Sequence, residues 1–67
     1  MASPVHPPTE LSERIRALVE SSSIAGASRQ LRMAEATVAR LAGGLRVTEG
    51  TAVIAAQRLA EIEKTAA

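Results

Sequence analysis

The sequence contains no cysteine, no aspartate and no phenylalanine, tyrosine or tryptophan. The absence of cysteine excludes disulfide bonds and thiolate metal sites, and the single histidine, His6, has no ligand partner near it in the sequence. No two carboxylates suggest an acid–base pair, and Gly43-Gly44 lacks the lysine that follows the glycines of a phosphate-binding loop. We therefore expect no catalytic residues, no metal, no cofactor and no small-molecule ligand, and the protein is predicted not to be an enzyme.

Long apolar runs are also missing. No run approaches the roughly 20 residues needed to span a bilayer, and residues 1–8 lack the cationic start and apolar segment of a signal peptide. The sequence thus predicts a cytoplasmic protein without a membrane partner. Its 67 residues make one domain. A core built only from Ala, Leu, Ile, Val and Met is thin at this size, and a second subunit is a common supplement.

The charged residues nearly cancel, because eight Lys and Arg face seven Glu for a net charge of +1. Their distribution is uneven. Residues 29–46 carry four arginines and one glutamate, a net charge of +3, whereas residues 1–28 and 47–67 each carry a net charge of −1. A positive segment between acidic flanks is typical of a nucleic-acid contact. Four exposed arginines that serve only to keep two short helices in contact with water would give the same pattern.

Apolar residues recur at helical spacing in four segments of the chain. The expected helices span about residues 10–21, 24–32, 35–42 and 49–63. Residues 1–8 hold all three prolines and are predicted to be a flexible tail. The sequence therefore predicts a small all-α domain over residues 9–67.

Residues at the expected helix ends agree with this assignment. Thr9, Ser23 and Thr48 stand where a side chain can cap the first N–H groups of a helix. Gly43 and Gly44 follow the third expected helix and can adopt the left-handed conformation that ends it.

The stretch from Ile24 to Gly44 is predicted to be a helix-turn-helix. Its apolar residues are spaced by four, two, five and three positions, at Ala27, Leu31, Met33, Val38 and Leu41. This spacing suits a short helix, a tight turn that Met33 fills, and a second helix that crosses the first. The second helix of such a unit commonly lies in the major groove of DNA.

The last expected helix carries two apolar stripes. Ala52, Ala55, Leu59 and Ile62 share one face, and Val53, Ala56 and Ala60 form a second stripe roughly opposite. One four-helix core cannot cover both. Our hypothesis is that the second stripe, Val53, Ala56 and Ala60, is a homodimer interface; the alternative is that these are scattered surface residues.

Residues 27–44, ASRQLRMAEATVARLAGG, resemble the helix-turn-helix of the lambda-repressor-like class, which includes Cro and many phage and plasmid repressors. The lactose-repressor family has a similar ATVSRxLxG signature, echoed here by residues 36–41. A full amphipathic helix before the motif, and no ligand-binding domain after it, favour the first class. The resemblance extends over about residues 10–63 and includes RVTEGT at 46–51.

The resemblance implies a four- or five-helix domain whose third helix enters the major groove by its N-terminal half. The side chains presented there would be Ala34, Glu35, Ala36, Thr37 and Arg40. Arg40 could bond the O6 and N7 atoms of a guanine, or instead contact phosphate or pair with Glu35. Glu35 could accept from a cytosine amino group, hold Arg40, or stabilise the helix start. Ala36 and Thr37 could contact a thymine methyl group, and Thr37 could also donate to phosphate.

Further residues would contact the DNA backbone on both sides of the groove. These phosphate candidates are Ser23, Arg29, Arg32 and Arg46. Four such contacts in one subunit are weak, and a dimer on a palindrome with half-sites about one helical turn apart would double them. The predicted function is therefore a sequence-specific regulator of transcription, a repressor that binds double-stranded DNA as a homodimer.

The sequence departs from the family pattern at three places. Arg32 occupies the turn position where glycine is usual, so the turn is either reshaped or holds Arg32 in a left-handed conformation. Gly43 stands where an amide side chain is frequent. The fifth helix of the family is either missing or merged into residues 49–63.

Two other classes of function remain open. An Ala-rich recognition helix also suits a small protein-binding module, such as an antirepressor or an antitoxin-like partner. A purely structural oligomer would self-associate without any affinity for nucleic acid.

Overall fold

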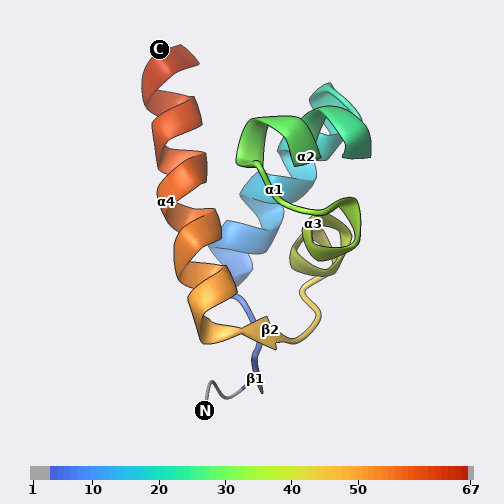
Figure 1. The fold of residues 1–67 in the computed structure, drawn as a ribbon, viewed down its shortest axis with the longest axis vertical. Coiled ribbons are helices and arrows are strands. Elements are labelled where there is room, and N and C mark those ends of the chain that lie inside the picture. The colour runs from blue at the N-terminus through green and yellow to red at the C-terminus, as the bar shows by residue number, and fades with distance from the viewer. Residues whose placement is uncertain (1–3, 67) are drawn as a thin grey trace.

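The computed structural model describes residues 4–66 of the chain, which form four helices and one small two-stranded ribbon (Figure 1). The elements are β1 (Pro4–Val5), α1 (Thr9–Ser21), α2 (Ile24–Leu31), α3 (Glu35–Ala42), β2 (Val47–Thr48) and α4 (Glu49–Ala66). Each helix starts within one residue of its predicted position, and α4 extends beyond residue 63. The described part of the chain has no fifth helix, and the predicted all-α character is confirmed.

The core is entirely aliphatic and lies where the four helices meet. Its buried side chains are Leu11, Ile15, Ala27, Leu31, Val38, Leu41, Val47, Ala55 and Leu59. The helix-turn-helix contributes four of them, and α1 packs against both of its helices. The predicted inner face of α4 packs on this core through the buried Ala55 and Leu59, and Ala52 and Ile62 are half-buried at the edges of the core. Periodicity alone thus identified which side of each helix is buried.

The ribbon joins the N-terminal segment of the chain to the segment just before α4. Pro4 pairs with Thr48 and Val5 with Val47 in antiparallel register, Pro7 is buried, and Nδ1 of His6 donates to the carbonyl oxygen of Gly44 at 3.1 Å. Residues 4–8 therefore pack on the domain, which corrects the prediction that residues 1–8 are a flexible tail; residues 1–3 lie outside the described part. Proline favours extended backbone, so little conformational entropy is lost when this segment adds to a sheet edge.

The turn between α2 and α3 is tight and is completed by a left-handed residue. Arg32 has φ 54° and ψ 48°, so the left-handed option predicted for this position is the one observed. The N–H of Met33 donates to the carbonyl oxygen of Ser28 at 3.1 Å, and the Ser28 hydroxyl donates to the Met33 carbonyl. These bonds close the end of α2 and turn the chain directly into α3.

Four of the helix ends were predicted from capping residues, and the structure agrees with most of them. Ser23 accepts from the N–H of Gly26 at 2.9 Å, and Thr48 accepts from the N–H of Thr51 at 3.2 Å. Two of the three predicted side-chain caps are thus confirmed. Thr9, by contrast, is the first residue of α1, and Pro8 precedes it without a side-chain cap. At the end of α3 only Gly44 is left-handed, with φ 70°, whereas Gly43 keeps a helical conformation.

We expect Arg32→Gly to raise the free energy of unfolding by about 1 kcal/mol, because a left-handed backbone costs roughly that much for a residue with a Cβ atom and little for glycine. Urea unfolding of the purified domain measures the change. Arg29→Gly is the matched control, since Arg29 lies within α2 and glycine inside a helix costs about 1 kcal/mol. Equal destabilisation by both substitutions would contradict the conformational account of Arg32.

Candidate nucleic-acid interface

Helix α3 is anchored by two side chains and leaves its outer side uncovered. Val38 and Leu41 are fully buried against α1 and α2. The side chains that remain exposed are Glu35, Ala36, Ala39 and Arg40, and Thr37 is half-buried beside them. In Figure 1, α3 is seen almost end-on, on the side of the domain away from α4. The monomer therefore has a short helix whose outer face is available for contact with another molecule.

Arg40 is held in place by the loop that follows α3. Its Nε and Nη2 atoms donate to the carbonyl oxygen of Arg46 at 3.2 and 3.0 Å. The alternative that Arg40 pairs with Glu35 is not observed within residues 4–66. A guanidinium has five N–H donors, so this arrangement orients the group and leaves donors for a ligand.

Several of the predicted contact residues meet in one hollow, which we call the α3–β2 hollow. It has a volume of about 440 Å³ and is lined by Pro4, Thr37, Arg40, Arg46, Val47, Thr48 and Thr51. The lining thus combines two guanidinium groups with the hydroxyls of Thr48 and Thr51, which lie 2.6 Å apart. Positively charged groups and hydroxyl groups that donate hydrogen bonds are the ones that bind phosphate. Thr48 was predicted only as a cap and Thr51 was not singled out, because no motif marks a surface formed across a loop.

The other predicted phosphate contacts are distributed around the domain. Arg29 is exposed on α2, and the hydroxyl of Ser23 is already engaged by the N–H of Gly26. Ala34 is the exposed residue just before α3. Arg16, which sequence reasoning missed, donates from Nε and Nη2 to the carbonyl oxygen of Ala42 at 3.2 and 2.9 Å and so lies at the C-terminal end of α3.

The arginines differ in whether a carboxylate neutralises them. Within the described residues, ion pairs involve only Arg14, which meets Glu10 and Glu63, and Arg32. Arg16, Arg40 and Arg46, all close to α3, have no carboxylate partner there. The guanidinium groups of Arg16, Arg40 and Arg46 are therefore unpaired, whereas Glu61 and Glu63 of α4 each lie beside an arginine.

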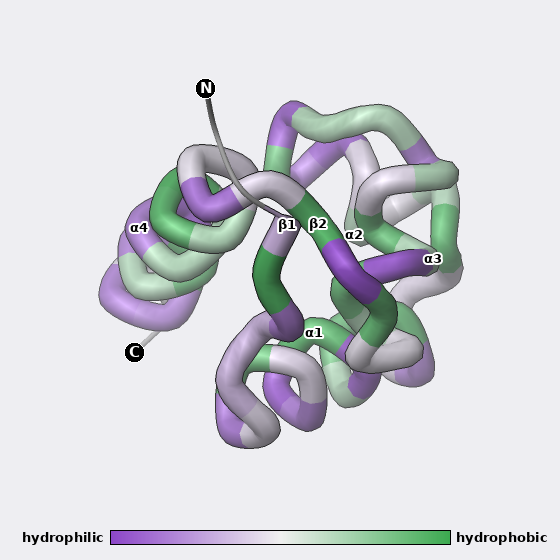
Figure 2. The backbone as a smooth tube through the Cα atoms, turned by 90° about the horizontal axis from the view of Figure 1, so that it is seen from below, coloured by the Kyte–Doolittle hydropathy of each residue, from purple (hydrophilic) through white to green (hydrophobic). Residues whose placement is uncertain are grey.

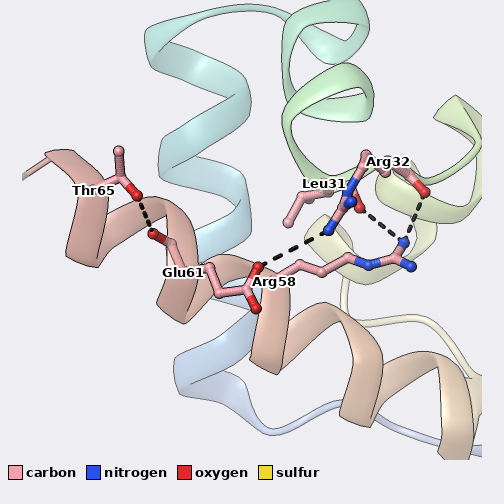
Figure 3. A network of polar contacts seen from close by, with 5 residues as sticks. All are labelled: Leu31, Arg32, Arg58, Glu61 and Thr65. Atoms are coloured by element: carbon pink, nitrogen blue, oxygen red, sulfur yellow. Dashed lines mark hydrogen bonds and ion pairs between the residues drawn. The ribbon is translucent and has the colours of Figure 1, made fainter.

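Arg32 belongs to a separate group of residues on the α2–α4 side (Figure 3). Its Nη2 lies 4.0 Å from Oε2 of Glu61, and both side chains are about 70% exposed, at 70% and 73%. Nη1 of Arg58 donates to the carbonyl oxygens of Leu31 and Arg32 at 3.1 and 2.8 Å. Arg32 thus lies with the α4 carboxylate and is not brought together with Arg40 and Arg46.

The proposed dimer residues lie on the outer surface of α4. Val53 is 50% exposed, and Ala56 and Ala60 are exposed. Seen from below in Figure 2, α4 and α3 lie on opposite sides of the domain with the β1–β2 ribbon between them. A partner on this face of α4 would leave the outer side of α3 free.

Comparison of the chain with protein-family models, with curated proteins and with solved structures gave no match in any of the three. None of the helices in residues 4–66 is both long and apolar enough to cross a membrane. Within the same residues, no three side chains of the metal-binding types cluster together.

Proposed function

We propose that the protein is a lambda-repressor-like helix-turn-helix regulator that binds double-stranded DNA in a sequence-dependent manner, as a homodimer and a repressor. The observation that carries the proposal is the exposed outer side of α3, with Glu35, Ala36 and Arg40 on it, beside arginines that have no carboxylate partner in the described part of the chain. The left-handed turn at Arg32 supports it, because it joins two short helices as this motif requires.

In this proposal the two sides of α3 have different tasks. Ala36 and the Thr37 methyl group approach base edges, since small side chains let the helix enter the groove closely. Arg46 and the hydroxyls of the α3–β2 hollow contact phosphate. Arg40 lies between these regions, oriented by the Arg46 carbonyl at 3.0 Å, and its free donors face the groove edge. This division separates residues that select a sequence from residues that supply affinity.

The test is selection of bound duplexes from a random library, followed by binding of the selected sequence at several salt concentrations. We expect a palindromic sequence with half-sites about one helical turn apart and an affinity that falls steeply with salt. No enrichment, together with no binding to any duplex at low salt, would overturn the proposal. The alanine-rich outer side of α3 would then favour the rival function, a small protein-binding module.

Arg40→Ala and Arg46→Ala are expected to act differently. Arg40→Ala should reduce discrimination at one base pair, where a bidentate contact is worth about 1–3 kcal/mol. Arg46→Ala should weaken binding to all duplexes alike and reduce the log–log salt slope by about 0.9 per subunit. Fluorescence anisotropy on the selected duplex and on single-base variants separates the two effects. Unchanged affinity and preference after Arg40→Ala would show that α3 is placed wrongly in this proposal.

A further inference from the structure

The outward face of α4 carries an ordered pattern that the monomer does not use. Glu49, Val53, Ala56, Ala60 and Lys64 are separated by four, three, four and four residues and are all exposed. We call these five residues the α4 outer stripe. At this spacing they share one side of a helix, turned away from the buried Ala55 and Leu59. The stripe is apolar in its middle and charged at both ends, with opposite signs.

The two end charges of the stripe have no partner within residues 4–66. Glu49 and Lys64 form no ion pair and donate or accept no side-chain hydrogen bond there. Other charged residues of α4 are engaged by neighbouring helices: Glu63 binds Arg14 of α1, and Glu61 lies 4.0 Å from Arg32. The unpaired charges are therefore those that flank the exposed apolar residues.

We propose that α4 packs antiparallel against α4 of a second copy through the α4 outer stripe. In this arrangement Glu49 lies opposite Lys64 of the second copy, Val53 opposite its Ala60, and the two-fold axis passes near Ala56. The stripe is complementary to itself when reversed, as a two-fold interface requires. A parallel pair would instead place Glu49 against Glu49 and Lys64 against Lys64. The inference rests on the homodimer of the proposed function and specifies its register.

The side chains of the α4 outer stripe also suit close packing of two helices. Ala56 and Ala60 allow two helix backbones to approach closely, and Val53 provides the one larger apolar side chain of the stripe. Beside it lies a hollow of about 330 Å³, lined by Pro8, Glu10, Leu11, Arg14, Ala52, Val53 and Ala56. This hollow extends the apolar surface from α4 onto the start of α1, so side chains of a second copy can be accommodated on that flank.

The experiment uses sedimentation velocity on the full chain at about 100 µM, without DNA. Glu49→Lys and Lys64→Glu each replace two attractive pairs of the dimer by two repulsive ones, and each should raise the dimer dissociation constant roughly 10- to 30-fold. The double variant E49K/K64E should regain the original constant. An equimolar mixture of the two single variants should form a heterodimer at a concentration at which each variant alone is largely monomeric. Glu13→Lys, an exposed reversal on α1, is the matched control and should change little.

The double variant makes the test independent of folding. Glu49 stands at the N-terminal end of α4 and Lys64 near its C-terminal end, so each reversal weakens the helix slightly and these effects add in the double variant. A weaker α4 helix therefore cannot explain why the double variant regains the dimer. The inference would be overturned if the protein were monomeric at 100 µM, or if all three variants kept the dimer dissociation constant of the original chain. Recovery without any DNA binding would support this register while removing the DNA-binding proposal.

Discussion

Replacing Ala36 with glutamate is expected to lower the affinity for duplex DNA by about 100-fold while leaving the fold intact. Ala36 is exposed on the outer side of α3, where the proposed complex brings the helix against base edges between two phosphate chains. A carboxylate there would face like charge, which costs several kcal/mol when water is excluded. It would also stand four residues before Arg40 and could neutralise that guanidinium. Anisotropy titration with the selected duplex measures the loss.

Ala17→Glu is the matched control for this experiment. Ala17 is exposed on α1, opposite the side that carries the buried Ile15, so the same substitution adds the same charge away from α3. Both variants should remain folded, because both sites are exposed and helical. Loss of DNA affinity in Ala36→Glu alone would support the placement of α3 in the groove. Equal affinity in the two variants would contradict it.

Arg58→Ala is expected to destabilise the fold by about 2 kcal/mol. Arg58 is half-buried on α4 and donates to two carbonyl oxygens at the end of α2, those of Leu31 and Arg32 (Figure 3). Carbonyls at a helix end have no partner within the helix, and hydrogen bonds from a charged donor contribute about 1.5–3 kcal/mol. In a domain of this size the thermal midpoint should fall by roughly 10 °C.

Glu61→Gln tests whether this region is stabilised by the hydrogen bonds of Arg58 or by the neighbouring ion pair between Arg32 and Glu61. Glu61 is 4.0 Å from Arg32, and an exposed ion pair of this kind contributes at most about 1 kcal/mol. We expect Glu61→Gln to change the free energy of unfolding by less than about 0.5 kcal/mol in urea titration. If Glu61→Gln were as harmful as Arg58→Ala, the stability of this region would come from the ion pair and not from the cap.

The helices could be predicted because their determinants are local. The stripe of Leu11 and Ile15 marks the buried side of α1, and Ser23 and Thr48 cap α2 and α4 as expected, because a cap depends on a few neighbouring residues. At Arg32 the sequence indicated either a reshaped turn or a left-handed residue, and the structure has the left-handed residue. Short-range chemistry was sufficient for these features.

Features that join distant parts of the chain could not be predicted in the same way. Strands of two residues, such as Pro4–Val5, are too short to show alternation, and their pairing with Val47–Thr48 spans most of the sequence. The carbonyl partners of Arg40 and Arg58 follow from where helix ends meet in space. For the candidate site, the side of α3 that is exposed was predictable, whereas the α3–β2 hollow required the three-dimensional arrangement.

The β1–β2 ribbon has a practical consequence for any polypeptide attached to this domain. Pro4 lines the α3–β2 hollow together with Arg40 and Arg46, and β1 and the end of α4 lie at opposite extremes of a body about 35 Å long (Figure 1). An affinity tag or fluorescent label joined ahead of β1 would emerge beside these arginines and obstruct or mimic a ligand. Immobilisation through the end of α4 leaves that region open to solution.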